Sequence, residues 1–105
     1  MSLTYLYDFG LDSRDLDDLR DNTDDKTYSE LSLFDGIVKE NVQYMKDFGV
    51  SNFTQVILKY PEIFLRDSES FKNIFSKFDR DDLIQKVEKN PAVFKKMVDF
   101  VDNNW

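Results

Sequence analysis

The sequence predicts an all-α fold, a single small domain of about six helices. Its 105 residues are enough for one domain with its own apolar core. Apolar residues recur along most of the chain at intervals of three and four, which is the spacing of one helix face. In the second half of the chain, moreover, an apolar pattern recurs after thirty residues, as expected for a repeated helical unit.

The repeat keeps its apolar positions while its polar positions vary. The matching pairs are Tyr44 with Ile74, Met45 with Phe75, Phe48 with Phe78, Phe53 with Leu83, Ile57 with Val87, Pro61 with Pro91, and Phe64 with Phe94. Each unit is predicted to contain two helices, a proline bend and a short helix. We therefore divide the single domain, residues 1–105, into an acidic N-terminal cap or arm over 1–35 and a helical repeat region over 36–105.

The N-terminal cap is expected to contain a strand or arm, a short helix and a polar loop. Residues 3–7 are short, apolar and compatible with either an edge strand or an extended arm. Asp12 is a suitable N-cap for a short helix that carries Leu16 and Leu19 on one face. Residues 21–26 are polar and predict a loop.

A long helix is expected next. Thr27 and Glu30 have the spacing of a capping box. One apolar side of the helix then follows, made of Leu31, Phe34, Val38, Val42 and Met45. Gly49 is the natural left-handed stop after Phe48.

The proline bends separate the remaining helices. Ser51 is the expected N-cap of the next helix, and Pro61 bends the chain and opens a short helix over 61–65. Asp67 or Ser68 begins another helix, and Asp79 caps the one after it.

The second bend repeats the first, with Asn90 as the cap and Pro91 at the first position of the last helix. That helix continues at regular apolar spacing toward Trp105.

The phenylalanines at helical spacing are expected to face mainly inward. They are Phe34, Phe48, Phe53, Phe64, Phe71, Phe75, Phe78 and Phe94. A stack of two repeats leaves an open end, where exposed apolar residues predict a homodimer or partner contact. The residues expected there are Met97, Phe100, Val101 and Trp105.

Residues 41–105 resemble the repeat of mitochondrial transcription termination factors. The segments that carry the resemblance are 44–50, 57–64 and 87–94, with Pro61 and Pro91 at the bends. The resemblance implies helix pairs, each followed by a proline and a short helix, and family members stack more such repeats to bind nucleic acid on a basic concave face. This chain has only two repeats, and residues 41–105 contain ten acidic and ten basic residues.

The net negative charge of the chain comes from its first third. Residues 1–35 contain ten acidic and three basic residues, which accounts for the whole net charge of −7. Acidity opposes direct nucleic-acid binding and favours a basic protein partner. The predicted partner-binding residues are Asp12, Asp15, Asp17, Asp18, Asp21, Asp24, Asp25 and Trp105.

Composition argues against most catalytic chemistry. Without Cys and His the chain cannot form disulfides, Cys–His or Ser–His machinery, or the usual zinc site. No glycine-rich phosphate loop is present. An EF-hand loop starting at Asp21 fails because Lys26 replaces the turn glycine and Ser32 replaces the bidentate glutamate. We therefore expect no enzyme, cofactor or metal, and the lack of a long apolar run predicts a soluble intracellular protein.

Three functions remain open at this stage. The first is a non-enzymatic protein-binding module that docks a basic partner through its Asp-rich N-terminal region. The second is a phage-type inhibitor of a nuclease, acting against restriction or CRISPR enzymes by imitating nucleic acid. The third, which the resemblance implies, is nucleic-acid binding by the helical repeat.

Overall fold

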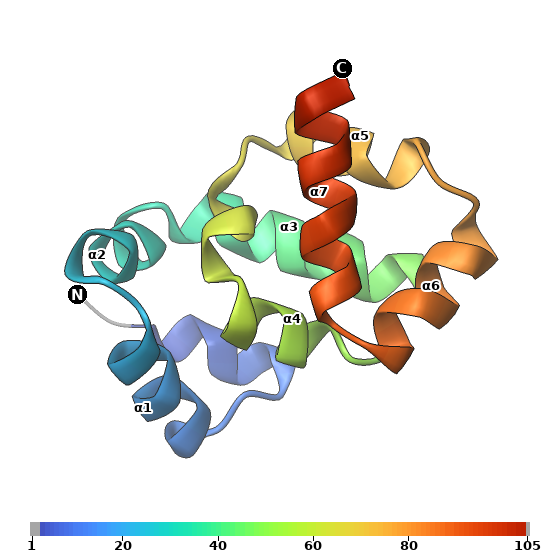
Figure 1. Cartoon of the computed structure of the whole chain (residues 1–105). Coiled ribbons are helices and arrows are strands. Elements are labelled where there is room, and N and C mark those ends of the chain that lie inside the picture. Colours follow the sequence, from blue (N-terminus) through green and yellow to red (C-terminus); the bar gives the residue numbers. More distant parts are fainter. Residues whose placement is uncertain (1–2, 105) are drawn as a thin grey trace.

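The computed structural model describes residues 3–104, which form one all-helical domain with no strand among them (Figure 1). No helix in this part of the chain is both long and apolar enough to cross a membrane. The elements, with 3₁₀-helices marked η, are η1 (Thr4–Phe9), α1 (Ser13–Asn22), α2 (Asp25–Leu33), α3 (Asp35–Phe48), α4 (Phe53–Lys59), η2 (Pro61–Leu65), α5 (Ser68–Ser76), α6 (Arg80–Lys89) and α7 (Ala92–Asn104).

The first element is a 3₁₀-helix, so both predictions for residues 3–7, an edge strand and an extended arm, are wrong. A 3₁₀-helix has three residues per turn, which places Leu3 and Leu6 on the same side. Both side chains are buried, and η1 packs against α3. Gly10 ends η1 in the left-handed region, at a φ of 94°.

The predicted long helix is two helices, α2 and α3, which meet at Phe34. The backbone of Phe34 leaves the helical region, with φ −106° and ψ 38°. Gly36 lowers the helix propensity of the residues that follow this break. The capping box at Thr27 is also wrong, because α2 begins at Asp25 and its N-cap is Asp24.

The repeat region follows the predicted order of helices and bends. Pro61 opens η2, and Pro91 directly precedes α7. The first unit comprises the second half of α3 with α4 and η2, and the second comprises α5, α6 and α7. Every residue of the seven matching pairs is buried or half-buried. The units differ at their ends, since η2 has five residues where α7 has thirteen.

Side-chain caps begin several of the helices, mostly where they were predicted. Asp12, Asp67 and Asp79 each accept a hydrogen bond from a backbone N–H in the first turn, and Asn90 accepts one from the N–H of Ala92. The prediction for Ser51 is wrong. Its N–H and hydroxyl donate to the Glu88 carboxylate of α6, so this residue joins the two repeat units.

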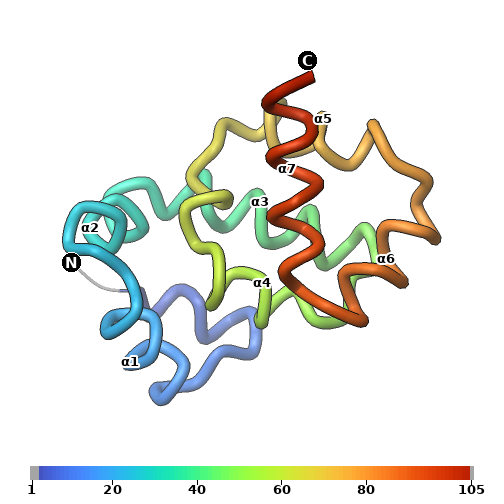
Figure 2. Tube along the Cα trace, viewed as in Figure 1, coloured from blue at the N-terminus to red at the C-terminus, as the bar shows by residue number. Residues whose placement is uncertain are grey.

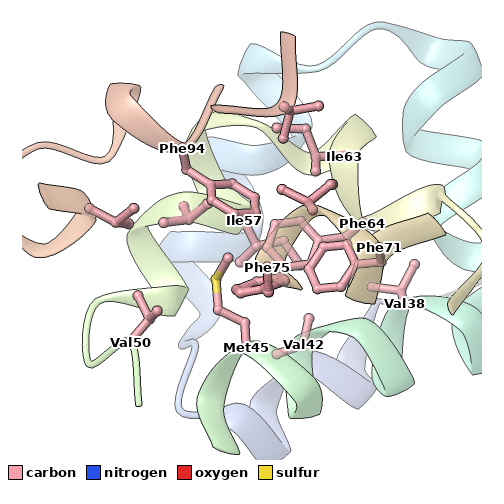
Figure 3. Close-up of a cluster of buried hydrophobic side chains, with 14 of the residues drawn as sticks. Val38, Val42, Met45, Val50, Ile57, Ile63, Phe64, Phe71, Phe75 and Phe94 are labelled. Atoms are coloured by element: carbon pink, nitrogen blue, oxygen red, sulfur yellow. The ribbon is translucent and has the colours of Figure 1, made fainter. Parts of the chain in front are cut away.

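The core is a cluster of four fully buried aromatic rings (Figure 3). Phe71 lies 5.2 Å from both Phe64 and Phe75, centroid to centroid, and Phe75 lies 5.4 Å from Phe94. Met45 and two valines of α3 close one side of the cluster. The inward prediction thus holds for these four phenylalanines. Three others, Phe48, Phe53 and Phe78, are half-buried, and Phe34 is exposed, contrary to expectation.

One polar side chain, that of Asn41 on α3, is fully buried beside this cluster. Its amide Nδ2 donates to the carbonyls of Phe64 at 3.0 Å and Arg66 at 2.8 Å. These carbonyls lie at the end of η2, a segment that contacts α2, α3 and α4. Figure 2 shows η2 crossing the middle of the molecule between α2 and α7 in that view. Asn41 therefore fixes η2 against α3.

Substitution of Asn41 by Ala should destabilise the fold. The change leaves the buried Phe64 carbonyl and the partly buried Arg66 carbonyl without their side-chain donor, so we expect the free energy of unfolding to fall by about 2 kcal/mol. Urea denaturation measures this loss. Gln43→Ala is the matched control, because Gln43 is also on α3 and donates only to the exposed Asp47. Equal effects of the two substitutions would contradict the assigned role of Asn41.

Candidate protein-binding surface

Helix α1 orients the first aspartates. The Asp12 carboxylate accepts from the Asp15 N–H at 2.8 Å, and the Asp15 carboxylate accepts from the Asp12 N–H at 3.0 Å. This reciprocal capping box fixes the start of the helix. Leu19 on the inner face is fully buried, and α1 packs on α4. The outer face consequently carries three exposed aspartates, namely Asp17, Asp18 and Asp21.

Two more aspartates lie at the tight corner between α1 and α2. The loop predicted over residues 21–26 is confirmed only at Thr23 and Asp24, because α1 runs through Asn22 and α2 begins at Asp25. Asp24 caps α2 by accepting from the Thr27 N–H at 2.7 Å. This hydrogen bond lowers the pKa of Asp24. Asp25 lies in the first turn of α2, where its negative charge interacts favourably with the helix dipole.

The seven aspartates form what we call the acidic surface. Its members are Asp12, Asp15, Asp17, Asp18, Asp21, Asp24 and Asp25. Within residues 3–104, no Lys or Arg forms a salt bridge with any of them. Three have capping roles, whereas Asp17, Asp18 and Asp21 project from α1 without such a role. The acidic surface thus carries uncompensated charge.

The acidic side chains of this surface are spread out along the helices. Across the described part of the chain, no three acidic side chains gather closely enough to hold a metal ion. The segment after Asp21 is helical, so it does not form the loop that wraps an EF-hand calcium ion.

Lysine 59 borders the acidic surface without neutralising it. Together with Asp18 and Leu58 it lines a shallow depression between α1 and α4, and it also lines a neighbouring depression next to Asp24. Neither aspartate lies within salt-bridge distance of Lys59, since the ion pairs of residues 3–104 occur elsewhere. At α4 the acidic surface therefore borders a basic side chain of the repeat region.

The predicted apolar end is mostly closed. Met97 and Val101 are buried, contrary to expectation, because α7 packs them against the rest of the core cluster. Phe100 is 50% exposed, and its ring contacts that of Phe78 at 6.1 Å between centroids. Trp105, the remaining predicted partner-binding residue, lies outside the described residues. A homodimer contact at this end stays a prediction that rests on Phe100 and Trp105.

A different apolar pair is exposed at the junction of α2 and α3. Leu33 is 58% exposed and Phe34 is 46% exposed. Sequence reasoning missed this pair because it placed Phe34 on the buried face of one long helix. The signal available was the density of apolar residues in Leu31-Ser32-Leu33-Phe34, which exceeds what one helix face can bury.

Tyr5 holds this junction from the inner side. Its hydroxyl donates to the carbonyl of Leu31, in the last turn of α2, at 2.7 Å. Lys39 of α3 lies with its Nζ 5.5 Å from the centroid of the Tyr5 ring and 3.7 Å from the Asp35 carboxylate. Burial, together with the nearby charge of Asp35, raises the pKa of Tyr5 well above its ordinary value. The junction is thus fixed by contacts from η1, α2 and α3.

No protein-family model, curated protein or solved structure matches this chain. Its functional assignment therefore depends on its own residues, and the relationship to termination factors stays a prediction.

Removal of the Tyr5 hydroxyl should weaken the fold at neutral pH. We expect Tyr5→Phe to lower the free energy of unfolding by about 1 kcal/mol, because the Leu31 carbonyl loses its donor. Tyr7→Phe is the matched control, since Tyr7 lies in the same short helix and is 44% exposed. Chemical denaturation of both variants measures the difference.

The effect should also depend on pH. The pKa of Tyr5 is higher in the folded state than its ordinary value of 10.0. The contribution of the phenol is therefore complete below about pH 10 and is lost as the pH rises above it. The stability gap between wild type and Tyr5→Phe should shrink in that range, and a gap that widens would contradict the assignment.

Proposed function

We propose that this chain is a non-enzymatic protein-binding module that docks a basic partner through its acidic surface. The observation that carries the proposal is the absence of salt bridges to the seven aspartates within residues 3–104. Between Asp12 and Asp25 the chain contains seven aspartates and two arginines, a net charge of −5. Such a field attracts a positively charged surface and accelerates its association.

The distribution of ion pairs supports the same assignment. Five of the eleven cations of the repeat region are paired with carboxylates, and the region contains eleven acidic residues as well, so it offers no net positive charge to a phosphate backbone. The pairs are Lys39–Asp35, Arg66–Asp102, Lys72–Glu40, Lys86–Asp82 and Lys95–Asp99. Nucleic-acid binding depends on cations that neutralise phosphates. A protein partner is therefore favoured over direct nucleic-acid binding by the repeat.

Exposed aspartates on the rigid helix α1 also support the second candidate, an inhibitor of a nuclease that imitates nucleic acid. Asp17 and Asp18 project from one turn of α1 and Asp21 from the next, so their charges are spread along the outer side of the helix as phosphates are along a backbone. This candidate uses the same surface and requires the partner to be a nucleic-acid-binding protein. Competition by duplex DNA for the captured partner separates it from other basic partners.

The test is affinity capture of a partner from an extract of the organism that makes this protein. The variant Asp17→Asn, Asp18→Asn, Asp21→Asn removes three charges and leaves the helix caps intact. We expect it to weaken capture about tenfold at low salt and less at high salt, where exposed charges are screened.

The matched control is Asp47→Asn, Glu69→Gln, Asp81→Asn, which removes three exposed acidic charges from the repeat region. It changes the net charge by the same amount, so capture should stay close to that of wild type. The proposal fails if the control weakens capture as much as the α1 variant, or if the α1 variant captures the partner like wild type.

A further inference from the structure

The apolar pair at the α2–α3 junction leaves about half of its surface uncovered by this domain. Leu33 and Phe34 are consecutive residues, and both are more exposed than most apolar side chains in the molecule. The other large exposed apolar residues among 3–104 are Tyr7 and Phe100, which lie far apart in sequence. Adjacent exposed apolar side chains of this size are typical of the centre of a binding interface.

The backbone that carries this pair is rigid. Leu31, two residues before Leu33, is fully buried, and its carbonyl accepts from Tyr5 at 2.7 Å. On the other side of the junction, the Val38 N–H donates to the Phe34 carbonyl, and Val38 is fully buried. The backbone at Leu33 and Phe34 is therefore anchored on both sides before any partner binds, which lowers the backbone entropy lost on binding.

Helix α2 connects the apolar pair to the acidic surface. Asp25, Ser29 and Leu33 are all exposed and are spaced by four residues, so they follow one face of the helix. The distance along the axis from Asp25 to Leu33 is about 12 Å. This face, with Phe34 at its end, is acidic at its start and apolar at its end. In Figure 1, α2 lies at the left of the molecule, opposite α6.

We propose that this face of α2, with Leu33 and Phe34 as anchors, docks a basic amphipathic helix of the partner protein. This inference rests on the proposed function, and it specifies which kind of segment of the partner protein binds: a helix with basic and apolar side chains. Apolar side chains of the bound helix cover Leu33 and Phe34, while its Lys and Arg side chains meet the carboxylates at the start of α2.

Charge complementarity identifies the occupant. Residues 24–35 contain Asp24, Asp25, Glu30 and Asp35 against the single cation Lys26, a net charge of −3, and after Lys39 neutralises Asp35 across the junction a net charge of −2 is left. A second copy of the chain would bring a net charge of −7 and the same carboxylates to the contact, so repulsion opposes it. A basic helix brings the opposite charge and an apolar stripe in one element.

The probe is a synthetic helical peptide of about 16 residues with Leu at positions i, i+3 and i+4 and Lys elsewhere. Two control peptides keep its length. One replaces Leu by Gln at equal charge, and the other replaces Lys by Glu. Titration calorimetry with the full chain at about 50 mM and about 500 mM salt separates apolar from electrostatic contributions. We expect only the Leu–Lys peptide to bind at both salt concentrations.

Two variants locate the site. Leu33→Gln with Phe34→Gln should weaken peptide binding about tenfold at both salt concentrations. Phe100→Gln is the matched control, because Phe100 is exposed to a similar degree on α7, and it should bind like wild type. Circular dichroism confirms that each variant is folded, as expected for substitutions of exposed side chains.

Several results would overturn the inference. Equal binding of the peptide by wild type and by the double variant excludes this face, as does the absence of any binding by wild type. Equal binding of the Gln–Lys peptide shows that charge alone acts, in which case the acidic surface retains its proposed role and the apolar anchor fails. Self-association of wild type that the double variant abolishes would assign the face to a second copy of the chain.

Discussion

The fold depends on the pair of hydrogen bonds that Asn41 donates from α3 to the end of η2. Asn41 and Phe64 are fully buried, so the Phe64 carbonyl has no water available in place of the amide, and the half-buried Arg66 supplies a second acceptor. These two hydrogen bonds fix the backbone of the first proline bend, which begins at Pro61. Phe64 then enters the ring cluster, and Arg66 reaches the Asp102 carboxylate of α7 at 2.6 Å. One amide thereby positions both the core and the last helix.

Much of this architecture could be predicted from local sequence. Pro61 and Pro91 mark the bends, and Asp67 and Asp79 mark helix starts, because these effects act over a few residues. The break at Phe34 could not be predicted, since a helix-forming pattern continues through it. It depends on how η1 and η2 pack against α2 and α3, which are contacts between segments distant in the chain.

The candidate site was predicted only in part for a related reason. Counting charges identifies an acidic N-terminal third, but it does not separate the capping carboxylates of Asp12 and Asp24 from the unpaired ones of Asp17 and Asp21. The two groups of carboxylates can be told apart only from the hydrogen bonds and salt bridges in the structure. The exposure of Leu33 was not predicted, because the spacing of apolar residues was interpreted as one face of a single uninterrupted helix. The structure thus separates a charge-balanced repeat region from an acidic surface on α1 and α2, which we propose as the recognition surface.

Site-directed photo-crosslinking tests this division most directly. A benzophenone side chain replaces Leu33 at the exposed α2–α3 junction or, as a control, exposed Gln85 on α6. Irradiation in the organism that makes the protein should join position 33, and not position 85, to one protein, through a Lys- and Arg-rich helical segment. Crosslinks from position 85 to that same protein, or attachment from position 33 to an acidic segment, would contradict the account.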